Sequence, residues 1–313
     1  MSEIKVKIIA DSIGFHSKKR ITTFELEYPR FIHSELMTHR LFSRNAMSSR
    51  AVPVAKMIEQ VRTSPAQPCH WGKNQPGMQA KEELVGESLE NVQREWHTAS
   101  ASAVYHAKLL NEQGAHKQIV NRTLEPFQMM KTVLTATEFD NFFWLRKHPD
   151  AQPEIKELAE KMFEAMEVGA CMTQELDVGD WHTPYYEAGY WFKGESPHSL
   201  EDALAISSSC CAQVSYRLLD DSLEKARDIF SKLVESKPVH ASPFEHQATP
   251  MQQGGEFWDE SGEYSLNCPS SADCWEAGIT HSDRQGDLWS GNFRAWIQHR
   301  QLIEDNVCWK YEE

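Results

Sequence analysis

The sequence lacks the features that define several large classes of protein. No apolar run approaches the ~20 residues of a membrane span, and the first residues, MSEIKVKIIADSIG, contain no apolar core of a signal peptide. None of the seven cysteines forms a Cys-x-x-Cys pair, which argues against a disulfide framework and against a recognised zinc spacing. We therefore expect a cytoplasmic protein with reduced thiols, no membrane association and no bound metal.

Positive charge is also scarce. The 313 residues include 32 Lys plus Arg against 46 Asp plus Glu, which gives a net charge of −14. Nucleic-acid surfaces need concentrated positive charge, so we expect no nucleic-acid partner, while small basic pockets for anions stay compatible with this balance. With 40% hydrophobic and 25% charged residues, the composition is typical of a folded globular protein.

The spacing of apolar residues predicts both strands and helices. Alternation predicts short strands at 4–8 and 24–28. Helices are predicted at 29–42, 82–111, 126–147, 153–166 and 221–236. Residues 63–81 carry Pro, Gly and Asn and are predicted to form a loop. We expect one α+β domain over residues 1–313, with 251–291 as a surface insertion.

A dense polar cluster follows the first predicted helix. Residues 39–50 have the pattern H-R-x-x-S-x-N-x-x-S-x-R, and the stretch 38–50 contains three arginines, three serines, an Asn and a His. Guanidinium forks, hydroxyls and backbone N–H groups are the groups that hold phosphates. On composition alone, a solvated helix end followed by a polar loop would fit equally well.

The spacing of this cluster resembles the signature of the flavin-dependent thymidylate synthases, the ThyX family. That signature is R-H-R, then x-x-S, x-N and x-x-S-x-R, and Thr38 stands where the family has its first Arg. Three further segments resemble family patterns: 139–155 is similar to N-F-x-x-L-R with its following A-Q-x-E-I, 122–126 is similar to R-x-x-x-P, and 240–246 is similar to H-x-T/S-P-F-E-H.

The order of these segments differs from that of the family, in which H-x-T/S-P-F-E-H precedes R-H-R. Here it follows, after a segment at 209–216 that resembles the family's A-A-R-V-S-F. We infer a circularly permuted, divergent member, in which the strand at 22–28 rejoins the sheet from a new chain end. Trp296-Ile-Gln-His299-Arg300 resembles a partial duplicate of the motif, and we expect a structural role for it.

The resemblance implies a fold and an activity. It implies an antiparallel sheet flanked by helices, assembled as a homotetramer. It also implies an FAD-dependent enzyme that makes dTMP from dUMP, with methylenetetrahydrofolate as the carbon donor and NADPH as the reductant of the flavin. The expected partners are therefore a pyrimidine deoxynucleotide monophosphate, a folate and NADPH.

The same resemblance implies roles for individual residues. Arg146 is expected to be catalytic, because its planar, permanently charged guanidinium suits an ionised pyrimidine ring. The residues expected to bind the nucleotide are Glu35, Thr38, Ser48, Arg50, Arg122 and Arg146. The residues expected to bind FAD are Thr38, His39, Arg40, Leu41, Asn141, His240, Ser242 and Glu245.

Departures from the family pattern leave other activities open. Ala46 replaces a family Glu, Glu35 stands where Gln is usual, and Thr135-Ala-Thr137 replaces N-x-R. Because a carboxylate accepts a hydrogen bond from the cytosine amino group, dCMP and a hydroxymethyl product are alternatives.

Loss of the family's ligand contacts at these positions would also fit a non-catalytic nucleotide- or flavin-binding regulator. Pro68-Cys69-His70 resembles the nucleophile segment of the flavin-independent thymidylate synthases.

Overall fold

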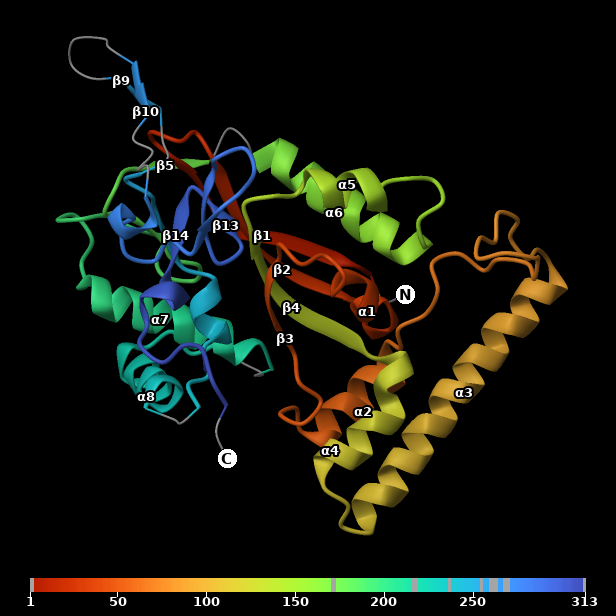
Figure 1. Cartoon of the computed structure of the whole chain (residues 1–313). Helices are drawn as coiled ribbons and strands as arrows, with labels where there is room; N and C mark the ends of the chain where they lie inside the picture. The colour runs from red at the N-terminus through yellow and green to blue at the C-terminus, as the bar shows by residue number, and fades with distance from the viewer. Residues whose placement is uncertain are drawn as a thin grey trace.

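A five-stranded sheet forms the centre of the computed structural model (Figure 1). The structure describes residues 3–169, 173–215, 219–235, 238–253, 256–258, 264–266 and 271–311. The strands are β1 (Lys5–Gly14), β2 (Arg20–Pro29), β3 (Ser43–Ala46), β4 (Met129–Ala136) and β5 (Gln174–Leu176), in the order β3-β4-β2-β1-β5. All neighbours are antiparallel except β5, which joins β1 in parallel. The expected antiparallel sheet is confirmed.

Helices cover the sheet and extend it. Helices α5 (Asp140–Arg146) and α6 (Pro153–Gly169) lie over one face, and α7 (Leu200–Ala212) packs near the other with α8 (Leu223–Val234) against it (Figure 1). At one end of the sheet lie α2 (Val54–Thr63), α3 (Glu87–Glu112), α4 (Lys117–Val120) and the 3₁₀ helix η2 (Asn121–Phe127). Among the described residues, no helix has both the length and the apolar character to cross a membrane.

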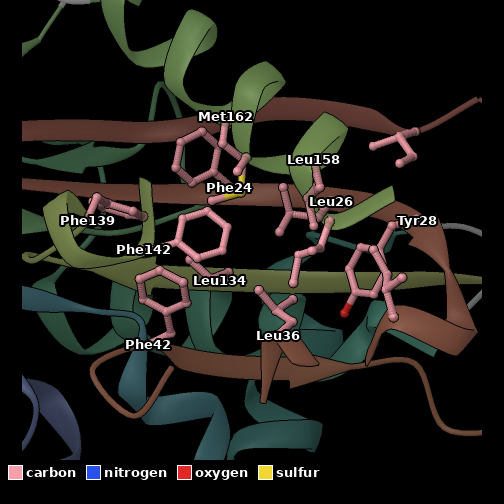
Figure 2. Close-up of a cluster of buried hydrophobic side chains, with 14 of the residues drawn as sticks. Phe24, Leu26, Tyr28, Leu36, Phe42, Leu134, Phe139, Phe142, Leu158 and Met162 are labelled. Atoms are coloured by element: carbon pink, nitrogen blue, oxygen red, sulfur yellow. The ribbon is translucent and has the colours of Figure 1, made fainter. Parts of the chain in front are cut away.

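The main core lies between the sheet and α5–α6 (Figure 2). Alternate residues of β2, Phe24, Leu26 and Tyr28, point to this face because successive side chains of a strand alternate. They meet Leu158 and Met162, which share one face of α6 because they are four residues apart. Each large apolar side chain buried here contributes roughly 1.5–3 kcal/mol to the free energy of folding, so this layer fixes α5 and the residues at its end.

A second sheet holds the C-terminal half against the first. Its strands are β14 (Trp296–Gln298), β8 (Ala248–Pro250), β6 (Trp181–His182) and β7 (Tyr190–Trp191), in that order. A buried chain of hydrogen bonds joins the two sheets: Ser12 Oγ to His182 Nδ1 at 2.8 Å, His182 Nε2 to Thr23 at 2.7 Å, Thr23 to Thr135 at 2.8 Å, and Thr135 to His246 Nδ1 at 2.8 Å. Burial lowers the pKa of both histidines to about 3, so they are neutral links.

Short elements complete the described chain. Near the N-terminus these are η1 (Arg30–Ile32) and α1 (His33–Leu36). The C-terminal ones are η4 (Gln213–Ser215), η5 (Ser242–Glu245), β9 (Glu256–Trp258), β10 (Tyr264–Leu266), η6 (Ala272–Cys274), β11 (His281–Ser282), β12 (Leu288–Ser290), β13 (Phe293–Arg294) and η7 (His299–Leu302). Part of the segment expected to be an insertion, 251–291, lies outside the described residues. Its last residues do not lie at the surface, because Leu288 and Ser290 are buried.

Two predicted helices are wrong. Residues 126–147 form the strand β4 followed by the short helix α5. The β-branched Thr132, Val133 and Thr135 favour a strand, and β4 is paired on both sides, so its apolar run shows no alternation. The helix predicted at 29–42 ends at Leu36, after which the chain turns into β3. The loop at 63–81 and the helices near 82–111, 153–166 and 221–236 are confirmed, with small shifts of their ends.

Candidate active site

Arg146, at the end of α5, is held by three side chains from α1 and the turn after it. Its Nε donates to His39 Nε2 at 2.9 Å, its Nη1 to Glu35 Oε2 at 2.9 Å and its Nη2 to Thr38 Oγ1 at 3.2 Å. More than 100 residues separate Arg146 from these partners. Four of the predicted site residues therefore lie together, and we call them the Arg146 group.

The protonation state of His39 follows from this geometry. Burial, followed by the positive charges of Arg146 and Arg44, lowers the His39 pKa to about 4. The ring is therefore neutral at neutral pH, and its Nε2 can accept the Arg146 N–H because the proton lies on Nδ1. Phe142 contacts the ring edge-on at 4.9 Å between centroids. His39 thus acts as a fixed support that orients the guanidinium.

The Arg146 group keeps donors for a ligand. A guanidinium carries five N–H groups, and within the described residues each of Nη1 and Nη2 has one hydrogen-bond partner. One N–H remains on each nitrogen, at a side chain that is 21% exposed. These two N–H groups of Arg146 are charged, coplanar and partly buried. They suit an oxygen or nitrogen atom of a heterocycle that gains negative charge.

A second feature is a cavity of about 470 Å³ where β3 meets the C-terminal half. Ser48 lines it from the polar motif, and His240 and Ser242 line it from the segment that resembles H-x-T/S-P-F-E-H. Arg44 and Asn45 of β3 complete its polar wall, and Asn45 Nδ2 donates to the Cys211 backbone oxygen at 3.2 Å. The two separated motifs therefore meet in space, as the inferred permutation requires.

The other predicted site residues are not joined to these two groups through their side chains. Arg40, Arg50, Arg122 and Asn141 are exposed, and no hydrogen bond or ion pair between described residues connects their side chains to the Arg146 group or to Ser48, His240 and Ser242. Leu41 contributes its backbone oxygen, which accepts from Asn292 Nδ2 at 2.9 Å. Glu245, expected at the flavin, forms an ion pair with Arg300.

Residues that the sequence patterns did not indicate hold the motif in place. Asn121 Nδ2 donates to the backbone oxygens of Ser49 at 2.7 Å and Val52 at 2.9 Å. Ser43 Oγ hydrogen-bonds Asn292 Oδ1 at 3.1 Å and accepts from Gln298 Nε2 at 3.2 Å. Asn121 directly precedes Arg122, a predicted site residue, and this position in the sequence could have indicated it. No local pattern indicated Asn292, and Gln298 lies in the segment 296–300 that was expected to be structural, but its contact with Ser43 could not be predicted because the two are about 250 residues apart.

The second His-Arg pair, His299 and Arg300, lies beside the segment 240–246, which contributes His240 and Ser242 to the cavity. His299 is buried among the rings of Trp181, Phe230 and Phe244. Burial lowers the pKa of His299 to about 4, so it is a neutral packing residue at neutral pH. Its environment supports the structural role expected for this segment.

Cys69 lies in an environment that disfavours a thiolate. Its backbone N–H donates to Glu154 Oε1 at 2.9 Å. Although the residue is partly exposed, desolvation by its neighbours, followed by the charges of Glu154 and Glu157, raises the thiol pKa to about 12. Only the thiolate is an effective nucleophile, so the geometry argues against the mechanism of the flavin-independent enzymes.

Replacing Cys69 by serine is therefore expected to leave the turnover number close to that of the parent. Serine keeps the backbone contact to Glu154 and removes only the sulfur. Steady-state kinetics on the purified variant measure the effect. A loss of several orders of magnitude, as for a missing covalent nucleophile, would assign the chemistry to Cys69 after all.

One protein family matches part of this chain. Residues 19–169 match the Thy1 family, described as thymidylate synthase complementing protein. This stretch contains the whole Arg146 group, Ser48 and Arg122. The match spans just under half of the chain and agrees with the resemblance to the flavin-dependent thymidylate synthases seen in the sequence.

Solved structures give two further similarities. The UMP/dUMP methylase PolB from Streptomyces cacaoi, bound with 5-Br UMP, has 18% identity and a TM-score of 0.45, over 55% of this chain and 95% of PolB. The flavin dependent thymidylate synthase ThyX from Helicobacter pylori, complexed with FAD and dUMP, has 21% identity and a TM-score of 0.32, over 47% of this chain and 67% of that one. No curated protein matches the sequence.

Proposed function

We propose that this protein is a flavin-dependent enzyme that transfers a one-carbon unit to C5 of dUMP and yields dTMP. The Arg146 group is the observation that carries the proposal. Its guanidinium is fixed by Glu35, Thr38 and His39 and still has an N–H group available on each terminal nitrogen. The Thy1 match over residues 19–169 supports the same assignment.

Arg146 has the main chemical role in this proposal. For C5 of the pyrimidine to attack a carbon electrophile, negative charge must build up on the ring and its oxygens. A donor pair held in place before the reaction stabilises that charge without reorganisation cost. His39, neutral and packed against Phe142, keeps the pair oriented. Ser48, Arg50 and Arg122 are assigned to the nucleotide phosphate.

The residues around the cavity fit a flavin nucleotide. His240 and Ser242 offer an imidazole and a hydroxyl, which are groups that bind phosphate and ribityl oxygens. Reduced FAD supplies a hydride when bound. Methylenetetrahydrofolate and NADPH are the proposed co-substrates, and Thr38, Arg40, Leu41, Asn141 and Glu245 are assigned to FAD with the cavity residues. A homotetramer in the cytoplasm stays a prediction.

One observation also fits a second candidate, a flavin-dependent hydroxymethylase acting on dUMP or dCMP. The Glu35 carboxylate lies 2.9 Å from Arg146 Nη1, so an acceptor and a donor stand side by side. This pair matches the amino group and N3 of cytosine as well as it matches N3–H and O4 of uracil. With water instead of hydride as the final reactant, the product would carry a hydroxymethyl group.

Product mass distinguishes these functions. The purified protein is expected to carry FAD. With methylenetetrahydrofolate, NADPH and dUMP it should give a product heavier than dUMP by one CH₂ unit, as seen by mass spectrometry. A product that also carries an additional oxygen, or a product from dCMP alone, would replace the first function by the second. Binding of dUMP by a colourless protein that forms no product would indicate a regulator.

A further inference from the structure

Arg44 is a partly buried cation that has no acidic partner among the described residues. Its Nη1 donates to two backbone oxygens, that of Leu36 at the end of α1 at 3.1 Å and that of His39 in the turn after α1 at 3.0 Å. Between described residues, no carboxylate lies within ion-pair distance of its guanidinium, and Nε and Nη2 have no hydrogen-bond partner. Burial lowers the pKa of the Arg44 guanidinium from its usual value, and the negative charge of Glu245 opposes this shift.

An uncompensated charge of this kind is costly. Removing a cation from water without a counter-ion opposes folding, and the nearby Glu245 forms its ion pair with Arg300. The α1 carbonyls compensate only part of the charge. A bound anion would supply the missing interaction, so the arrangement is typical of a binding site.

The surroundings of Arg44 fit such an anion. Arg44 lines the cavity of about 470 Å³ together with Ser48, His240 and Ser242, and this volume is within the ~300–1,000 Å³ of small-molecule sites. The two hydroxyls and the imidazole can each donate a hydrogen bond. In the family pattern S-x-N, the position of Arg44 is the unspecified x, so the resemblance assigned it no role.

We propose that Arg44 binds the phosphate of a phosphate ester in this cavity, assisted by Ser48 and Ser242. The inference rests on the proposed function, in which dUMP and FAD both carry such a group. Because Arg44 also holds the backbone oxygen of His39, the phosphate anchor and the Arg146 group share one support. An occupied anion site would therefore hold His39 in the position that orients Arg146.

Ligand pairs that differ in phosphate test this proposal. Titration calorimetry would compare dUMP with deoxyuridine, and FAD with riboflavin, on the parent and on R44Q. Loss of the charged contact is expected to weaken one phosphate ester roughly 10- to 100-fold and to leave deoxyuridine and riboflavin unchanged. A loss confined to dUMP assigns the nucleotide phosphate, and a loss confined to FAD assigns the cofactor. Equal binding of both esters by parent and variant overturns the proposal.

Two controls make the result interpretable. R62Q removes an exposed arginine of α2 that is ion-paired with Glu59, and neither residue lines the cavity. This variant should bind all four ligands like the parent. Circular dichroism shows whether R44Q folds. If it does not, R44K is the second variant, and because it keeps the charge it should retain most of the binding.

Inorganic pyrophosphate separates this inference from the proposed function. If the parent binds neither dUMP nor FAD, the proposed function fails. The anion site then stands only if the parent binds pyrophosphate and R44K binds it more tightly than R44Q. Absence of pyrophosphate binding, or equal binding by the two variants, would overturn the site as well.

Discussion

Replacing Arg146 by alanine is expected to lower kcat about 10²–10³-fold, the usual effect of losing one donor to a developing negative charge. That charge is larger in the transition state than in the bound nucleotide, so KM should change little. Arg146→Lys keeps the charge but loses the planar fork that contacts His39, Glu35 and Thr38 together, and should also be slow. Steady-state kinetics with varied dUMP measure both constants.

Arg50→Ala provides the contrast for this prediction. Arg50 is exposed and is not joined to the Arg146 group through its side chain, so as a phosphate ligand it should mainly raise the KM for the nucleotide. If Arg146→Ala changed only KM, or Arg50→Ala only kcat, the two roles would have to be exchanged or abandoned.

Replacing Phe142 by alanine is expected to lower the free energy of unfolding by about 3–5 kcal/mol. Phe142 is 2% exposed, and its ring contacts those of His39, Phe42 and Phe143 with centroids 4.9–5.5 Å apart. Figure 2 shows Phe142 beside Phe42. The cavity left behind removes the packing that fixes both α5 and the His39 ring. Urea denaturation followed by circular dichroism measures the loss.

Trp144→Ala is the matched control, because Trp144 lies on the same helix and is 75% exposed. A substitution at such a surface position usually changes stability by less than about 0.5 kcal/mol. Equal destabilisation by the two variants would mean that α5 is not held by the core described here.

Local patterns predicted some elements well and others not at all. The stripe of apolar residues on α6 is a property of neighbouring residues, so 153–166 could be predicted from the sequence. The strand β4 is buried by β2, β3 and the helices together, and its apolar run had the length and composition of a buried helix. Such ambiguity is resolved only by partners distant in sequence.

Some residues of the candidate site could likewise be predicted from the sequence, and others could not. The resemblance led to Arg146, Glu35, Thr38 and His39, and the geometry brings them together. The pairing of Glu245 with Arg300 and the contacts of Asn292 with Leu41 and Ser43 could not be predicted. They depend on how the C-terminal half closes on the motif, which no spacing within either segment encodes.

The long separation between Ser43 and its partners Asn292 and Gln298 has a consequence for biosynthesis. The ribosome makes β3 early, but the side chains that hold its start are added about 250 residues later. At roughly 5–20 residues per second, the motif waits on the order of 10–50 s before it can take its final form. Once β4 has been made and has paired with β3, β3 is a sheet edge, which a chaperone could cover until these side chains are in place. The flavin and nucleotide of the proposed function should bind to the growing chain only after residues 292–298 have left the exit tunnel.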